Sequence, residues 1–171
     1  MLQGFNAVKV SDKIIAGNFY GEIYVFDGQK PGSRISLQPE KNIDGVIRTI
    51  EEMKNGYFVS CQSGSFYLDK KTFKNVKTFS GIYNLAPKYA KKLNDSIILL
   101  GSHYMIYKYN VFTHRYVDSI IKRVSSIGVG HNNEIYLGSN DGLYRWDKGA
   151  LYYFGKKYKS LLRINILAND R

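Results

Sequence analysis

The chain has 171 residues, of which 44% are hydrophobic, so it can bury a core and is not a disordered chain. Lys and Arg (25) outnumber Asp and Glu (14), which gives a net charge of +11, and the whole excess lies after residue 60. No run reaches the roughly 18 apolar residues of a membrane span, no signal peptide is visible, and the single Cys61 excludes an internal disulfide.

The chain repeats one pattern at a period of about forty residues. Each repeat holds an apolar segment, a turn and a second apolar segment that closes on Asp or Asn, at positions 27, 69, 110 and 147. An aromatic residue stands three positions earlier in every repeat: Tyr24, Phe66, Tyr107 and Tyr144. Self-similarity at this period is typical of stacked or radial repeat folds.

In chain order, the pattern predicts short strands separated by turns. The first repeat has strands at 5–10, 14–17 and 21–27, and the second has strands at 46–52, 57–61, 65–68 and 73–79. The Asn55-Gly56 pair between two of them predicts a hairpin turn with positive φ. The third repeat has strands at 97–101 and 105–110, with a longer segment at 82–96 that contains Pro87 and predicts a longer loop or an irregular first strand.

The fourth repeat has predicted strands at 124–129, 134–138, 143–146 and 151–154. Residues 161–168 resemble the first strand of a further repeat. We therefore predict an all-β protein, a β-propeller of about four four-stranded antiparallel blades plus the first strand of a fifth, without helix. The expected blades are 4–41, 43–80, 81–121 and 122–158, with the extra strand at 160–171.

Two arrangements of these blades stay open. The chain is either a piece of a larger propeller, which the opening strand at 5–10 favours, or a four-bladed ring closed by its last strand. A piece would expose an edge strand and an apolar face, so self-association is expected of it.

Most repeated residues have structural explanations. Gly17, Gly101, Gly138 and Cys61 end the second strand of each repeat, where a small residue lets the neighbouring sheet approach. The closing Asp or Asn is expected to turn the chain by accepting hydrogen bonds from nearby backbone N–H groups. We expect Cys61 to be a buried filler and not a nucleophile.

The sequence gives little support for a catalytic or cofactor site. His103, His114 and His131 fall in predicted turns or at strand edges, without metal-ligand spacing, and no phosphate-binding loop is present. His131 with Glu134 lies within one turn of the repeat. We predict no enzyme, no cofactor and no metal.

Candidate ligand-binding residues stand at the start of each inner strand, facing the expected axis. They are Arg48, Tyr83, Asn84, Arg123, Ser125, Arg163 and Asn165. Arginine can grip a carboxylate or sulfate with two hydrogen bonds, and aromatic rings can stack on sugars. An anionic oligosaccharide or polysaccharide is therefore the candidate partner, a merely solvated basic surface or channel is the alternative, and no nucleic-acid motif accompanies the charge.

Residues 124–147 carry the most specific resemblance. Asn132-Asn133-Glu134 followed by Ile135-Tyr136-Leu137-Gly138-Ser139, and Gly142-Leu143-Tyr144 before Asp147, resemble the two-component regulator propeller repeat, with Ser139 where Thr is usual. The resemblance implies a periplasmic or extracellular sensor region of a hybrid histidine kinase, which binds oligosaccharides or stabilises a dimer. Any membrane attachment would belong to other parts of such a protein. A dimerisation scaffold and, further away, a propeller lyase are the alternative functions.

Overall fold

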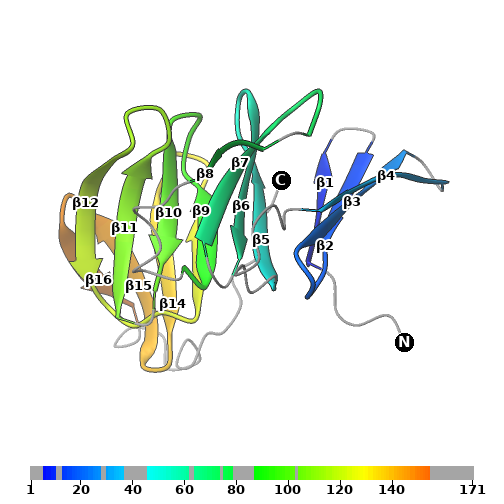
Figure 1. Cartoon of the computed structure of the whole chain (residues 1–171). Coiled ribbons are helices and arrows are strands. Elements are labelled where there is room, and N and C mark those ends of the chain that lie inside the picture. Colours follow the sequence, from blue (N-terminus) through cyan, green and yellow to red (C-terminus); the bar gives the residue numbers. More distant parts are fainter. Residues whose placement is uncertain are drawn as a thin grey trace. The chain divides into compact units, whose positions relative to one another are not determined.

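The computed structural model describes residues 6–10, 13–27, 30–36, 46–61, 64–73, 75–78, 87–102 and 104–154. These residues form strands and turns without a helix, so none of them belongs to a helix that could cross a membrane. The strands make four antiparallel sheets of four, each with its strands in chain order (Figure 1). The predicted all-β class and four-stranded repeats are confirmed, whereas the fifth-repeat strand at 160–171 lies outside the described residues.

The described strands divide into two compact units, with the boundary between Lys88 and Tyr89. Unit 1 holds the first and second sheets. The first sheet comprises β1 (Asn6–Val10), β2 (Lys13–Gly17), β3 (Glu22–Asp27) and β4 (Lys30–Ser36). The second comprises β5 (Ile47–Glu52), β6 (Gly56–Cys61), β7 (Gly64–Asp69) and β8 (Asn75–Thr78).

Unit 2 holds the third and fourth sheets. The third sheet comprises β9 (Tyr89–Lys92), β10 (Ile97–Gly101), β11 (Met105–Asn110) and β12 (Arg115–Ile121). The fourth comprises β13 (Ser126–Val129), β14 (Ile135–Ser139), β15 (Gly142–Asp147) and β16 (Ala150–Tyr153). Of the segment predicted to be irregular, 82–86 lies outside the described residues, and β9 follows directly after Pro87 and Lys88.

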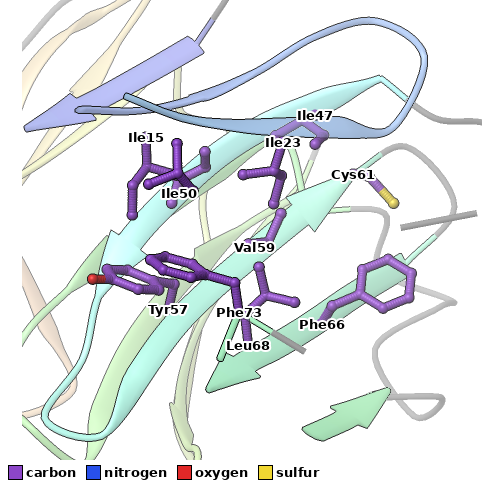
Figure 2. Packing of buried hydrophobic residues seen from close by; sticks show 11 residues of the cluster. Ile15, Ile23, Ile47, Ile50, Tyr57, Val59, Cys61, Phe66, Leu68 and Phe73 are labelled. Carbon is purple, nitrogen blue, oxygen red and sulfur yellow. The ribbon is translucent and has the colours of Figure 1, made fainter. Parts of the chain in front are cut away.

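The core of unit 1 joins its two sheets. Its buried side chains come from β2, β3, β5 to β7 and the turn after β7: Ile15, Ile23, Val25, Ile47, Ile50, Tyr57, Val59, Cys61, Phe66, Leu68 and Phe73. Figure 2 shows how Tyr57, Phe73 and their labelled neighbours pack. A Cβ on Gly17 would lie 2.5 Å from Cγ2 of Ile47 in the neighbouring sheet. The small residue therefore permits the close approach that the sequence predicts at this position, and Cys61 is buried as expected.

Phe73 corrects one predicted element. The sequence places it in a strand at 73–79, but it ends the turn after β7 in the left-handed region (φ 56°). Its N–H donates to the backbone carbonyl of Asp69 (2.9 Å), and its buried ring stacks on Tyr57 with the ring centroids 5.5 Å apart. Packing of this ring offsets the strain of positive φ in a residue with a bulky side chain.

The core of unit 2 also joins its two sheets. Leu99 and Ile106 of the third sheet meet side chains of the fourth sheet and of the segment before it: Val124, Ile127, Ile135, Leu137 and Trp146. Lys108 Nζ lies 4.3 Å from the ring centroid of Trp146, a cation–π contact between β11 and β15. A Cβ on Gly101 would lie 3.2 Å from Cδ1 of Ile127, so a small residue again faces the next sheet.

The turn chemistry is partly as predicted. Asp69 Oδ1 accepts the N–H groups of Lys71 and Thr72 (3.0 and 2.7 Å), and Asn110 Oδ1 accepts those two and three residues later (both 2.9 Å). After Asp147 the chain instead turns through Lys148 and Gly149, both at positive φ. Two consecutive residues of this kind suit a tight hairpin.

The turn at Asn55-Gly56 differs from the predicted one. Asn55 and Gly56 are not at positive φ, and a Cβ on Gly56 would overlap the backbone oxygen of Leu68, so this glycine serves a close approach.

On the outer strand β12, Asp118 pairs with Lys108 and Tyr116 with Tyr109, which leaves Val117 unpaired in a β-bulge.

Candidate binding site

The structure brings Arg123 and Ser125 together just before β13, the first strand of the fourth sheet. Arg123 is exposed and Ser125 is half-buried. Arg48 lies in unit 1 on β5, half-buried, at a bulge where Ile47 pairs with Cys61 and Thr49 with Ser60. The other predicted site residues lie outside the described residues: Tyr83, Asn84, Arg163 and Asn165.

Side chains and backbone of β14 fix the chain at Arg123. The Ser139 hydroxyl donates to the backbone carbonyl of Arg123 (2.8 Å). The backbone N–H of Ser125 donates to the carbonyl of Gly138 (2.8 Å), and the Ser125 hydroxyl donates to the same oxygen (3.2 Å). The guanidinium of Arg123 makes no hydrogen bond or ion pair with any described residue, so a held backbone presents a free cationic group.

The preceding residue, Lys122, is clamped in a cluster that the sequence analysis did not identify. We call Lys122, Asp141, Tyr144 and Tyr153 the Lys122 cluster. The Lys122 ammonium donates to both carboxylate oxygens of Asp141 (2.8 and 3.1 Å) and lies 3.8 Å from the ring centroid of Tyr144. The Tyr144 hydroxyl donates to Asp141 Oδ2 (2.7 Å), and that of Tyr153 donates to the Asp141 carbonyl (2.8 Å).

These contacts favour the ionised form of Asp141 and the protonated form of Lys122. Burial raises the pKa of Asp141, but hydrogen bonds from Lys122 and Tyr144 outweigh it and hold the pKa well below its usual range. Burial lowers the pKa of Lys122, and its hydrogen bonds to Asp141 and Tyr144 more than compensate, so the net shift is upward. Lys122 and Asp141 neutralise each other, which leaves Arg123 as the net charge of this segment.

Two exposed apolar residues stand at the adjoining ends of β11 and β12, before the same segment. Ile121, the last residue of β12, pairs in register with Met105, and Tyr104 directly precedes Met105. Both Tyr104 and Ile121 are strongly exposed. The sequence signal for this feature was a β-branched residue directly before two cations, Ile121-Lys122-Arg123, which the repeat alignment passes over.

Of the histidines predicted to be non-catalytic, His114 and His131 lie in turns of the described residues. His131 is exposed, and the nearby Glu134 carboxylate accepts the N–H of Asn132 (3.2 Å) inside the turn. His114 stands at positive φ with Nδ1 3.4 Å from the Tyr109 hydroxyl. His103 lies outside the described residues, and the described part of the chain has no group of three or more His, Cys, Asp or Glu placed to hold a metal ion.

Comparisons with known proteins establish the fold. No family model and no curated protein matches the sequence. Among solved structures, the crystal structure of the WD40 beta propeller domain of Doa1 is similar to this chain, with a TM-score of 0.71 and 16% sequence identity. The match covers 85% of this chain and 51% of that chain, so this chain spans about half the length of the propeller. The predicted β-propeller fold is confirmed, and the resemblance to two-component sensor repeats stays a prediction.

Proposed function

We propose that this chain is a non-catalytic interaction module that binds an anionic ligand through Arg123. The observation that carries the proposal is the free guanidinium of Arg123 on a backbone fixed by Ser139. A propeller offers a rigid frame for such a group, and a residue whose backbone is already held loses little backbone freedom when a ligand binds.

The charges of unit 2 support an anionic ligand. Every described Asp and Glu of this unit is engaged: four form ion pairs, with Lys92, Lys108, Lys122 and Arg145, and Glu134 accepts a backbone N–H. The described charged side chains without a contact are all cations: Arg115, Arg123 and Lys148. The unpaired charges that an approaching anion meets among the described residues of this unit are therefore all positive.

Arg123 is the best placed of these three cations. Arg115 opens β12 after a turn, and Lys148 stands at the tip of a tight hairpin at positive φ. Arg123 differs from both because it follows the clamped Lys122 and its own backbone carbonyl accepts the Ser139 hydroxyl. Its planar guanidinium can hold a carboxylate or sulfate with two parallel hydrogen bonds.

An anionic oligosaccharide, the partner predicted from the sequence, has this chemistry. Sensing of such a ligand by a periplasmic or extracellular propeller of a two-component system belongs to the same proposal. Arg48 is a second candidate contact, in unit 1. If the ligand fails to bind while the fold is intact, the role of a scaffold is favoured instead.

Calorimetric titration with heparin-derived and pectin-derived oligosaccharides tests the proposal. We expect Arg123→Ala to weaken binding about tenfold, since a charge-assisted hydrogen bond contributes about 1.5–3 kcal/mol. The matched control Arg115→Ala removes the same charge from an exposed site in the same unit and should leave affinity nearly unchanged. Equal losses in both variants would mean that only net charge is felt, and the proposed site would be wrong.

A further inference from the structure

We propose that β16, the outer strand of the fourth sheet, pairs with β16 of a second copy of this chain. The two strands lie antiparallel about a two-fold axis at Tyr152 and join two sheets into one continuous sheet. The inference goes beyond the proposed function, because Arg123 belongs to the linker before β13 and not to β16. It assigns a surface to the self-association that the sequence analysis expects.

The edge that β16 offers is uninterrupted. The strand stands last in the order of its sheet, and among the described strands it pairs with β15 alone. Its register runs from Tyr144↔Tyr153 to Asp147↔Ala150 without a shift, whereas β4, β8 and β12 each pair with a register shift. Because a bulge twists an edge away from an incoming strand, β16 is the most open edge among the outer strands that the structure describes.

The strand β16 also lacks charge. Its residues are Ala150-Leu151-Tyr152-Tyr153. The other outer strands each carry at least one charged residue: Lys30 and Arg34 on β4, Lys77 on β8, and Arg115 and Asp118 on β12. A charged residue near a two-fold axis would face its own charge on the second copy, which is destabilising. In a chain with a net charge of +11, the uncharged strand is therefore the edge that a second copy can approach.

The backbone of β16 turns hydrogen-bonding groups outward at Leu151 and Tyr153. The N–H of Phe154 donates to the carbonyl of Leu143 (2.9 Å), so these two residues form a hydrogen-bonded pair. Such pairs alternate along an antiparallel ladder, so Tyr152 also directs its N–H and C=O towards β15. The N–H and C=O groups of Leu151 and Tyr153 point away from β15, where no described strand lies beside them.

This alternation fixes the register of the proposed pair. With Tyr152 on the two-fold axis, Leu151 of each copy lies opposite Tyr153 of the other, and each of these pairs exchanges two backbone hydrogen bonds. The Tyr152 residues of the two copies form the non-hydrogen-bonded pair between them, where side chains approach most closely. Aromatic pairs across strands stabilise a sheet.

Both tyrosines of the strand are exposed and held in place. Tyr152 is 49% exposed, and its ring centroid lies 5.1 Å from Cζ of Arg145 on β15. On the other face of the sheet, the Tyr153 ring lies 4.9 Å from that of Tyr144, and its hydroxyl donates to the carbonyl of Asp141 (2.8 Å). The strand is therefore preorganised, which lowers the entropic cost of pairing.

Sedimentation velocity of the full chain at increasing concentration tests the interface. We expect a monomer–dimer equilibrium. Tyr152→Lys should raise the dissociation constant of the dimer at least about tenfold, because it sets two like charges opposite each other and removes the aromatic pair. The matched control Val117→Lys adds the same charge to an exposed position of another outer strand, β12, and should leave the constant nearly unchanged. Near-ultraviolet circular dichroism checks that each variant is folded.

Two further variants test whether residue 152 faces its own copy. Tyr152→Glu alone should weaken the dimer as Tyr152→Lys does, but an equimolar mixture of the two variants should recover it, because opposite charges then meet across the axis. Tyr152→Cys should form a disulfide-linked dimer on mild oxidation, since the Cα atoms of a non-hydrogen-bonded pair are about 4.5 Å apart. Val117→Cys is the control and should stay uncrosslinked.

The outcomes are separate from those of the proposed function. A monomer at every concentration, a dimer that Tyr152→Lys and Val117→Lys weaken equally, or a mixture of Tyr152→Lys and Tyr152→Glu that stays monomeric would overturn the proposed interface. None of these results involves Arg123, so the oligosaccharide titration of Arg123→Ala decides the proposed function independently.

Discussion

The first and fourth sheets each hold a carboxylate that accepts hydrogen bonds from a tyrosine hydroxyl and from a basic side chain. In the first sheet the carboxylate is the more buried partner, and in the fourth sheet the cation is. In the first sheet Glu22 accepts from Tyr24 (2.8 Å) and from Arg34. The Glu22 side chain is 15% exposed and that of Arg34 is 64% exposed. In the fourth sheet the cation is the covered member, with Lys122 at 18% and Asp141 at 59%.

The difference follows from where each cation originates. Arg34 lies on β4, the outer strand of the same sheet, so its pair with Glu22 stays within that sheet. Lys122 lies on the linker between the third and fourth sheets, so its pair with Asp141 ties the linker to the β14–β15 turn. The first cluster therefore stabilises a hairpin, and the second positions the residue that follows the lysine, Arg123.

The largest expected effect comes from removing a buried hydrogen-bond donor, Asn18, from the first cluster. The buried Asn18 amide donates to Glu22 Oε2 (2.7 Å), and its side-chain oxygen accepts the N–H groups of Tyr20 and Glu22 (2.9 and 3.0 Å). We expect Asn18→Ala to lower the free energy of unfolding by about 2–3 kcal/mol in urea titration, since it removes one donor from the covered Glu22 carboxylate and leaves two backbone N–H groups without their acceptor.

Asn140→Ala is the control for this prediction. Asn140 occupies the equivalent turn between β14 and β15, is exposed, and contributes no side-chain hydrogen bond to a described residue. Its replacement should change stability by less than about 0.5 kcal/mol. Equal effects of the two substitutions would contradict the assignment of Asn18 as the clamp of the first sheet.

Replacing the cation of each cluster sharpens the contrast. Lys122→Met should lower the free energy of unfolding by about 1 kcal/mol, because water can solvate the exposed Asp141 but the linker loses its tie. Arg34→Met should lower the free energy of unfolding by less than about 0.5 kcal/mol, because its guanidinium is solvated in the folded chain and Tyr24 and Asn18 still donate to Glu22. A larger loss in Arg34→Met than in Lys122→Met would reverse our interpretation of which cation is structural.

The smallest expected difference between the two clusters is in their acid titration. Hydrogen bonds from Tyr24, Asn18 and Arg34 hold the pKa of Glu22 below its usual value, and the pKa of Asp141 is depressed further. Both carboxylates therefore stabilise the fold above the unfolded pKa of about 4, and this contribution is lost as the pH falls from about 5 through the folded-state pKa values.

Carboxyl chemical shifts followed by nuclear magnetic resonance measure this order. We expect Asp141 to titrate at lower pH than Glu22. The urea midpoint of Asp141→Asn should depend less steeply on pH below about 5 than that of the unaltered chain. Normal titration of Asp141 would mean that its contacts with Lys122 and Tyr144 do not persist in solution.

The fold could be predicted from the sequence because its signals are local. Apolar segments predict the strands, and Asp69 and Asn110 close turns through hydrogen bonds to residues two or three positions later. A small residue such as Gly17 recurs in each repeat, where it faces the next sheet. Phe73 escaped prediction because a distant ring, Tyr57, decides its position. Asn55-Gly56 misled because the requirement at Gly56 is a close approach across strands and not a positive φ.

The candidate site could be predicted only in part. Arg123 and Ser125 followed from their position before an inner strand. Lys122 and Asp141 did not, because nineteen residues separate them and only the path of the linker brings them together. The exposure of Ile121 was also hidden, since an isoleucine in a strand is ordinarily expected to face the core.

The bulge at Val117 has a consequence for the solubility of the protein. Arg115 to Ile121 is rich in β-branched and aromatic residues and lies at the edge of its sheet, the composition and place from which intermolecular strands can grow into aggregates. The bulge interrupts the register between 115–116 and 118–121, so no long straight edge is offered to an incoming chain. We therefore expect the unpaired Val117 to hinder the addition of intermolecular strands at this edge.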